Sequence, residues 1–151
     1  MYLLKKLQEL SFGKFRFIDL LNFTSKNILL AALLYTIATL LVVLFQICLA
    51  IGLPWGAASM GGKFPGKYPP KMRWVAILNA IVLLALIIIV VIRAGFILPE
   101  FLLSSRIAIW GVVLFALLGT ILNSITPSKI ERIWAPVALI QLISSAMVAF
   151  S

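Results

Sequence analysis

The chain has 151 residues, of which 64% are apolar and only 11% are charged, and its mean hydropathy is +1.19. A water-soluble domain carries roughly 25% charged residues, so this composition excludes one and predicts an integral membrane protein. The net charge is +9, but the cations are spread between apolar runs. We therefore expect anionic lipid headgroups as their partners, and no nucleic acid.

Residues 1–26 mix leucine and phenylalanine with five cations. Leucines recur here at helical spacing, at Leu3, Leu4, Leu7 and Leu10. The charged residues lie largely on the other side of this helix. This pattern is typical of an amphipathic helix that lies in the membrane interface. We expect Gly13 to break that helix.

Residues 27–151 form the predicted transmembrane domain, because four apolar stretches in it reach the ~20 residues that a spanning helix needs. We place the helices near 27–51, 74–93, 99–123 and 129–150, joined first by a basic loop rich in glycine and proline at 52–73. The spacing of Ser128 and Glu131 fits a capping box at the start of the fourth helix. Tryptophans lie near the predicted helix ends, as in an interfacial belt, at Trp55, Trp74, Trp110 and Trp134. The predicted fold is an all-α, four-helix transmembrane bundle with an amphipathic N-terminal interfacial segment.

The orientation in the membrane stays open at this stage. Seven cations fall on the side of the N-terminus and six on the opposite side. The positive-inside rule does not decide on a difference of one, although the charges before the first helix favour an inside N-terminus. The small bias also leaves open insertion in both directions and an antiparallel homo-oligomer.

Several chemistries are disfavoured by what the sequence lacks. The chain contains no histidine, which excludes Ser-His and Cys-His catalysis, histidine-ligated metal and haem held by an axial histidine. No carboxylate lies within a predicted span, which argues against a proton-coupled carrier. We therefore expect no metal, no cofactor and no catalytic residue, and an intramembrane enzyme that uses Glu131 is only the third interpretation.

The basic loop carries the first candidate binding residues. Gly61 and Gly62 permit positive φ angles and could present backbone N–H groups to an anion. Lys63 and Arg73 could bind a phosphate or carboxylate, and ordinary contact with lipid headgroups is the alternative. The prolines of the loop should stiffen it, and the loop fits either a lid over the bundle or a partly re-entrant segment.

Four amides form the second candidate group, because each predicted span contains one, at Gln46, Asn79, Asn123 and Gln141. In an up-and-down bundle all four lie toward the side of the 52–73 loop. Amides in hydrocarbon are costly unless paired, so they should point inward. Two interpretations follow: hydrogen bonds that fasten the helices, or a polar vestibule beneath the loop.

Residues 123–136 emerge on the same side of the bundle. Glu131 could form an ion pair with Arg73 or another cation of the loop and hold the loop down. Arg132 would then be left to bind an anion or a lipid phosphate.

Two segments carry a resemblance: Pro54-Trp-Gly…Gly61-Gly…Pro69-Pro-Lys-Met-Arg73, and Asn123-Ser…Glu131-Arg-Ile-Trp-Ala-Pro136. They resemble loops of small uncharacterised bacterial membrane proteins with four spans. The resemblance covers under a third of the chain. It implies the four-span topology and a bacterial plasma membrane, and it brings no activity or cofactor with it.

The sequence thus favours a non-enzymatic membrane protein that binds or passes a small polar or anionic ligand, or a lipid headgroup, where the 52–74 loop meets residues 123–136. The alternative is a structural or accessory subunit whose basic loop docks a partner protein, for which Trp55, Phe64 and Tyr68 should form an exposed patch.

Overall fold

The computed structural model describes the backbone of residues 2–151 and the side chains of residues 24–151. The described chain is all-α, with short 3-10 helices η1 (Gly56–Ala58), η2 (Met60–Gly62), η3 (Pro99–Phe101) and η4 (Glu131–Ile133) between the long helices. The long helices are α1 (Tyr2–Ala50), α2 (Pro70–Arg93), α3 (Leu102–Ile125) and α4 (Trp134–Ala149). Four segments are long and apolar enough to cross a membrane, which confirms the predicted fold class: Thr24–Ala50, Pro70–Arg93, Pro99–Ile125 and Glu131–Ala149.

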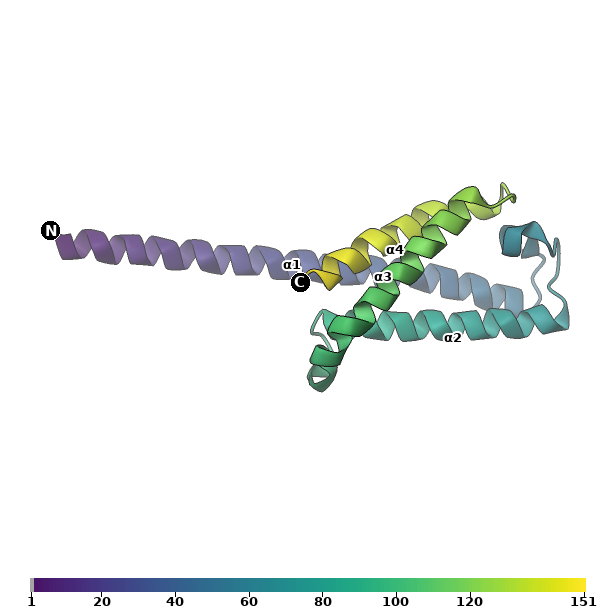
Figure 1. Ribbon diagram of the computed structural model, residues 1–151, viewed down its shortest axis with the longest axis horizontal. Helices are drawn as coiled ribbons and strands as arrows, with labels where there is room; N and C mark the ends of the chain where they lie inside the picture. Colours follow the sequence, from purple (N-terminus) through teal and green to yellow (C-terminus); the bar gives the residue numbers. More distant parts are fainter. Residues whose placement is uncertain (1) are drawn as a thin grey trace.

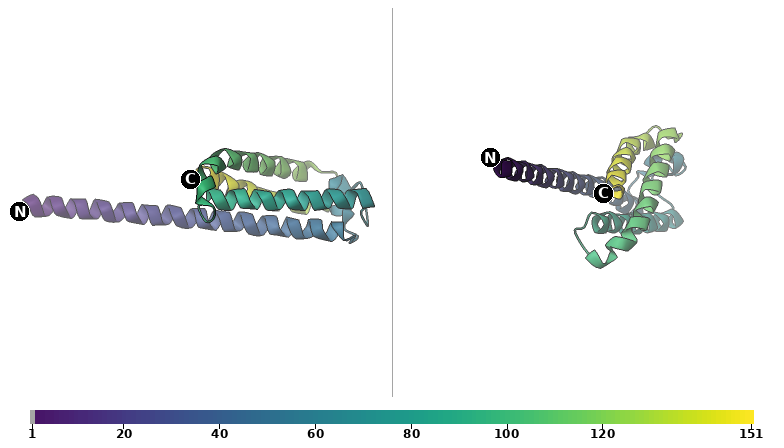
Figure 2. Two further views of the ribbon diagram at one scale, coloured as in Figure 1. Left: turned by 90° about the horizontal axis from the view of Figure 1, so that it is seen from below. Right: turned by 60° about the vertical axis from the view of Figure 1, so that its left-hand side comes forward.

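Helix α1 is a single helix of 49 residues whose N-terminal half extends beyond the other helices (Figures 1 and 2). The break expected at Gly13 is therefore wrong. One glycine inside a helix costs only about 1 kcal/mol, which good helix formers on both sides offset. The predicted interfacial placement of residues 1–26 depends on side chains 1–23, which lie outside the described residues, and it stays a prediction.

The other helix ends differ from the expected ones by a few residues. Helix α2 begins at Pro70 rather than near residue 74, because proline has a helical φ and its missing N–H is not needed in the first turn. Lys71 and Arg73 therefore belong to α2 and not to the loop. Helix α3 continues to Ile125, and the fourth span opens with the 3-10 turn η4 before α4 begins at Trp134.

The bundle is tightly packed at the end where α2 turns into α3. There, buried residues of all four helices form one apolar cluster: Ala31, Ala32, Tyr35, Val90, Ile109, Val112 and Val148. From this end α3 leans away from α2 (Figure 1), so the two helices diverge toward the loop between α1 and α2. We call that loop, residues 51–69, the cap loop. The fold thus leaves its free space beneath the cap loop.

Candidate functional site

The cap loop is compactly folded, although it contains only two single-turn 3-10 helices. The N–H of Gly56 donates to the carbonyl of Gly66 at 2.9 Å, which closes the loop on itself. A Cβ on Gly56 would collide with the carbonyl oxygen of Phe64, so this close approach requires glycine. Tyr68 is buried, and its ring meets that of Phe64 edge-to-face, with centroids 5.9 Å apart. Tyr68 therefore does not belong to the exposed patch of Trp55, Phe64 and Tyr68 expected for partner docking, whereas Trp55 is 48% exposed.

Three hydrogen bonds tie the cap loop to residues 126–134, about 70 residues later. The N–H of Gly61 donates to Oε2 of Glu131 at 2.8 Å. The hydroxyl of Ser128 donates to the carbonyl of Ala57 at 2.6 Å, and the indole N–H of Trp134 donates to the carbonyl of Ala58 at 3.0 Å. The two segments predicted to share one face therefore do meet, and η1 and η2 are held over the bundle.

Glu131 is the centre of this junction, but its partners differ from the expected ones. The same Oε2 accepts a second hydrogen bond, at 2.6 Å, from the hydroxyl of buried Thr126. The expected ion pair with Arg73 is absent from residues 24–151, because the Nε of Arg73 donates to the carbonyl of Tyr68 at 3.0 Å. The predicted capping box is only half formed: Ser128 Oγ accepts from the N–H of Glu131 at 3.4 Å, whereas the Glu131 carboxylate is occupied elsewhere.

The two glycines at 61 and 62 have the positive φ angles that the sequence suggested, 69° and 74°. The anion bound by the N–H of Gly61 is the protein's own carboxylate at Glu131. Gly62 packs against Ser128, whose Cβ would lie 3.2 Å from a Cβ added there. These glycines therefore shape the contact between the cap loop and residues 126–134.

A cavity of about 760 Å³ lies beneath the cap loop, with walls from all four long helices. All four predicted amides line it, and we call it the amide cavity: Gln46, Asn79, Asn123 and Gln141. Gly61, Lys63 and Glu131 also line it, on the side of the cap loop. Most of the remaining wall is apolar, for example Leu83 of α2 and Phe115 of α3. The amide cavity thus gathers seven of the ten predicted site residues.

The amides differ in the hydrogen bonds they make. Gln141 donates from Nε2 to the hydroxyl of Thr39 at 2.9 Å, which joins α4 to α1. Asn123 donates to the carbonyl of Gly119 on its own helix at 2.8 Å. Gln46 and Asn79 have no hydrogen-bond partner among residues 24–151. Fastening between helices therefore accounts for one of the four, and the other three keep hydrogen-bonding capacity for the cavity.

The remaining predicted site residues lie outside the amide cavity. The guanidinium of Arg73 covers Gly52, where an added Cβ would lie 2.8 Å from Nη2. Arg132 is exposed, and its Nε donates to the carbonyl of Thr126 at 3.1 Å. Gly62 contacts Ser128 as described. Arg73 and Arg132 therefore brace the backbone around the site.

Burial raises the pKa of the Tyr68 phenol. A side-chain hydrogen bond with Ser59 opposes this shift, and the negative charge of Glu131 adds to it. The cap loop thus contains a neutral phenol that resists ionisation.

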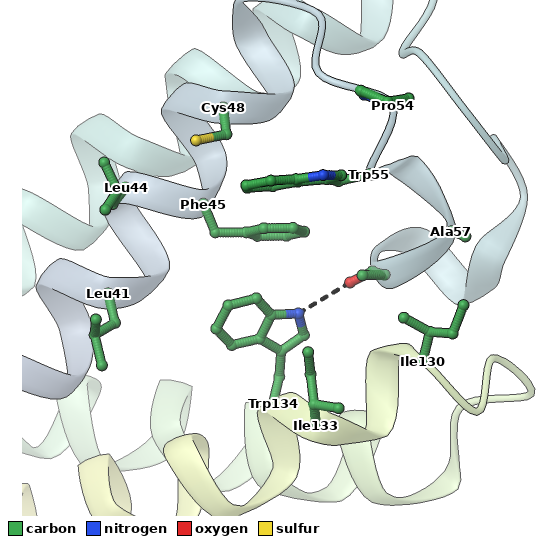
Figure 3. Close-up of a pocket in the computed structure, with 11 residues that line it drawn as sticks. Leu41, Leu44, Phe45, Cys48, Pro54, Trp55, Ala57, Ile130, Ile133 and Trp134 are labelled. Carbon is green, nitrogen blue, oxygen red and sulfur yellow. Dashed lines mark hydrogen bonds between the residues drawn. The ribbon is translucent and has the colours of Figure 1, made fainter.

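Sequence reasoning missed a second cavity, an apolar one of about 560 Å³ on the other side of Phe45 (Figure 3). The ring of Phe45 lies between two indoles, stacked on Trp55 with centroids 6.4 Å apart and tilted against Trp134 at 4.6 Å. We call this cavity the aromatic pocket. Its walls come from α1, the cap loop and residues 130–134: Leu41, Leu44, Phe45, Cys48, Pro54, Trp55, Ala57, Ala58, Ile130, Ile133 and Trp134. The sequence places both tryptophans in an interfacial belt and Trp55 also in a docking patch, and nothing in their spacing indicates the stack.

Comparisons with protein-family models, with curated proteins and with solved structures found no match to this chain.

Proposed function

We propose that the protein is a non-enzymatic membrane receptor whose amide cavity binds a small polar or anionic ligand, either a free anion or the headgroup of a lipid. The observation that carries this proposal is the convergence of four amides, one from each membrane-spanning helix, on one cavity under a pinned loop. Amides without partners are costly in an apolar bundle, so Gln46 and Asn79, which have none among residues 24–151, favour water or a ligand in the cavity.

Accessibility of the amide groups supports the same proposal. The one buried side-chain polar atom without a partner in the described part of the chain is Nε of Arg93, which lies at the end of α2 away from the cap loop. The unpaired amide of Gln46 is therefore accessible rather than sealed in a dry core, and Asn79 is exposed. Both can offer an N–H donor and a carbonyl acceptor to a ligand.

The charges around the cavity favour a ligand that is negative or rich in hydrogen-bond acceptors. The carboxylate of Glu131 already accepts two hydrogen bonds within the protein. The ammonium of Lys63 is the one cation that lines the cavity, and it has no ion-pair partner among residues 24–151. A ligand with a phosphate or carboxylate group would meet this charge together with the amide N–H groups.

Binding is favoured over passage through the membrane. The amide cavity does not continue to the other end of the bundle, where the cluster around Tyr35, Val90 and Val112 is at most 3% exposed. An enzymatic function has less support, because both candidate nucleophiles donate to backbone carbonyls. The hydroxyl of Ser128 donates to the carbonyl of Ala57, and the hydroxyl of Ser124 donates to the carbonyl of Thr120. Neither serine is hydrogen-bonded to the Glu131 carboxylate as a nucleophile would be to its base.

We further propose the bacterial plasma membrane as the location, with the N-terminus inside and the cap loop outside. Two things support this: the loop segments resemble those of bacterial four-span proteins, and four cations precede the first span while a fifth, Lys26, lies in its first turn.

Cysteine labelling in whole cells tests the orientation and the cavity together. On a Cys48→Ser background, single cysteines at Ser59, Asn79, Asn123 and Ser104 are exposed to a membrane-impermeant thiol reagent before and after permeabilisation. We expect the first three to react from outside and Ser104→Cys only after permeabilisation. If Ser59→Cys reacts but neither amide position ever does, the cavity is dry and the proposal fails.

Ligand protection then tests binding itself. Glycerol phosphate and inorganic phosphate, added in the millimolar range to the purified protein in nanodiscs, should slow labelling of Asn79→Cys and Asn123→Cys severalfold and leave Ser104→Cys unchanged. Protection by phosphatidylglycerol in the nanodisc, but by neither soluble probe, would identify a lipid headgroup. Unchanged labelling with all three probes would contradict an anion site.

A further inference from the structure

The aromatic pocket is a separate feature that the proposed function does not use. It shares Phe45, Ala58 and Trp134 with the amide cavity, and these residues form the wall between the two. The rest of the lining of the aromatic pocket is almost wholly apolar. The indole N–H of Trp134 and the carbonyl of Ala58 satisfy each other, which leaves the Cys48 thiol and the Trp55 N–H as its polar groups.

The position of the aromatic pocket determines what can fill it. Leu41 and Leu44 of α1 line the pocket and are 54% and 58% exposed, so the pocket opens on the outer face of a membrane-spanning helix. The medium on that face is lipid hydrocarbon. An empty apolar pocket loses dispersion contacts and water gains no partners in it, so a hydrocarbon chain is the occupant that stabilises it most.

Charge next to the pocket selects among lipids. Ile130 and Ile133 line the pocket, and two exposed cations, Lys129 and Arg132, precede them directly in the same turn. The Nε of Arg132 is fixed on the carbonyl of Thr126, whereas its two terminal nitrogens have no partner among residues 24–151. Lys129 likewise has no ion-pair partner in that range. Neither cation lines the pocket, but each adjoins a lining residue in the sequence, so a phosphate bound beside Ile130 and Ile133 would meet both charges.

We infer that the aromatic pocket is a binding site for one acyl chain of an anionic phospholipid, whose phosphate is held by Lys129 and Arg132. The volume of the pocket falls within the ~300–1,000 Å³ of ordinary ligand sites. The lipid would contact α1, the cap loop and residues 129–133 at once. Its binding therefore fastens the cap loop, and this role does not rest on a ligand in the amide cavity.

Fluorescence quenching by brominated lipids tests the inference, because Trp55 and Trp134 line the pocket and report on bromine in it. Trp74 and Trp110 are changed to phenylalanine to remove the other two indoles. This reporter protein is reconstituted in phosphatidylcholine vesicles with increasing fractions of either acyl-brominated phosphatidylglycerol or acyl-brominated phosphatidylcholine. We expect half-maximal quenching at an at least threefold lower fraction of the anionic lipid.

Two variants of the reporter separate the pocket from the general lipid contact of the bundle. Leu44→Phe partly fills the pocket and should reduce the quenching, whereas Leu40→Phe on the same helix, at a similarly exposed position outside the pocket, should not. In the double variant K129Q/R132Q, the two lipids should reach half-maximal quenching at about the same fraction. All these positions are exposed, so unchanged circular dichroism and elution volume are expected and verify folding.

Quenching that follows the bulk fraction of both lipids and ignores Leu44→Phe overturns the inference. So do equal half-maximal fractions of the two lipids in the reporter protein, since the site would then not select an anionic headgroup. A reporter that no brominated lipid quenches, and that elutes as a dimer which Leu44→Phe dissociates, would show a second copy of the chain on the pocket instead.

Discussion

The carboxylate of Glu131 accepts a hydrogen bond from the backbone N–H of Gly61, at 2.8 Å, across 70 residues of sequence. The same oxygen accepts from the hydroxyl of Thr126, so one side chain joins the cap loop to the end of α3. Hydrogen bonds to an ionised acceptor are about twice as strong as neutral ones, which makes this junction the strongest polar contact that holds the cap loop over the amide cavity.

Replacing Glu131 should therefore loosen the cap loop. Glu131→Ala leaves the N–H of Gly61 and the hydroxyl of buried Thr126 without their acceptor, and we expect a loss of about 1–3 kcal/mol. Trypsin cleavage after Lys63 and Lys67, two exposed lysines of the cap loop, measures the effect and should become at least tenfold faster.

The matched control for Glu131 is Glu100→Ala, which removes an exposed carboxylate that has no partner among residues 24–151. It should leave cleavage of the cap loop unchanged. Equal cleavage rates in the two variants would mean that Glu131 does not hold the loop.

Gly56→Ala should disrupt the internal fold of the cap loop. The added Cβ would collide with the carbonyl of Phe64 and lie 2.9 Å from that of Gly66, and backbone atoms cannot move aside as a side chain can. We expect a loss of about 2–3 kcal/mol, in the range for overpacking, as a lower thermal unfolding midpoint in detergent. Gly111→Ala in α3 is the control, because its Cβ would meet nothing within 4 Å and should stabilise the helix by up to about 1 kcal/mol. If both alanines were tolerated equally, the close packing described for Gly56 would be wrong.

The hydrogen bond between Gln141 and Thr39 should contribute little to stability. Interhelical hydrogen bonds in membranes are worth about 0.6 kcal/mol, and a double-mutant cycle with Gln141→Leu and Thr39→Val should give a coupling energy of that size. Titration with denaturing detergent measures it. A coupling energy above about 2 kcal/mol would identify Gln141 as primarily a fastener and weaken its assignment to a ligand site.

Because of Tyr68, the stability of the cap loop should decrease with rising pH in the alkaline range. Its pKa is raised in the folded protein, so the neutral phenol is favoured by folding. The resulting stabilisation is fully present below the unfolded pKa of about 10 and is lost as pH rises through the folded value. The thermal midpoint of the wild type should therefore fall more between pH 9 and pH 11 than that of Tyr68→Phe. Parallel pH profiles for the two proteins would rule out this role of Tyr68.

The sequence by itself determined the class of the protein and its outline. Apolar runs of spanning length fix four membrane helices, because backbone groups in hydrocarbon must be paired within each segment. The helix lengths alone also predict that one amide of each span lies toward the cap-loop side. These amides, Gln46, Asn79, Asn123 and Gln141, do line one cavity. Two predictions from local sequence were wrong. Helix α1 continues through Gly13, because one glycine destabilises an otherwise favourable helix only slightly, and α2 begins at Pro70 rather than near residue 74.

Only the tertiary structure decided which groups pair across the bundle. Glu131 was expected to meet Arg73, but it bonds the N–H of Gly61 and the hydroxyl of Thr126, since the folded cap loop presents a backbone donor at that point and turns Arg73 toward Tyr68. The aromatic stack of Phe45, Trp55 and Trp134 likewise combines α1, the cap loop and α4. Helical periodicity determines the face on which a residue lies. Contacts between residues some 70 positions apart depend on how the helices lean and how the loop closes, and no local pattern contains that information.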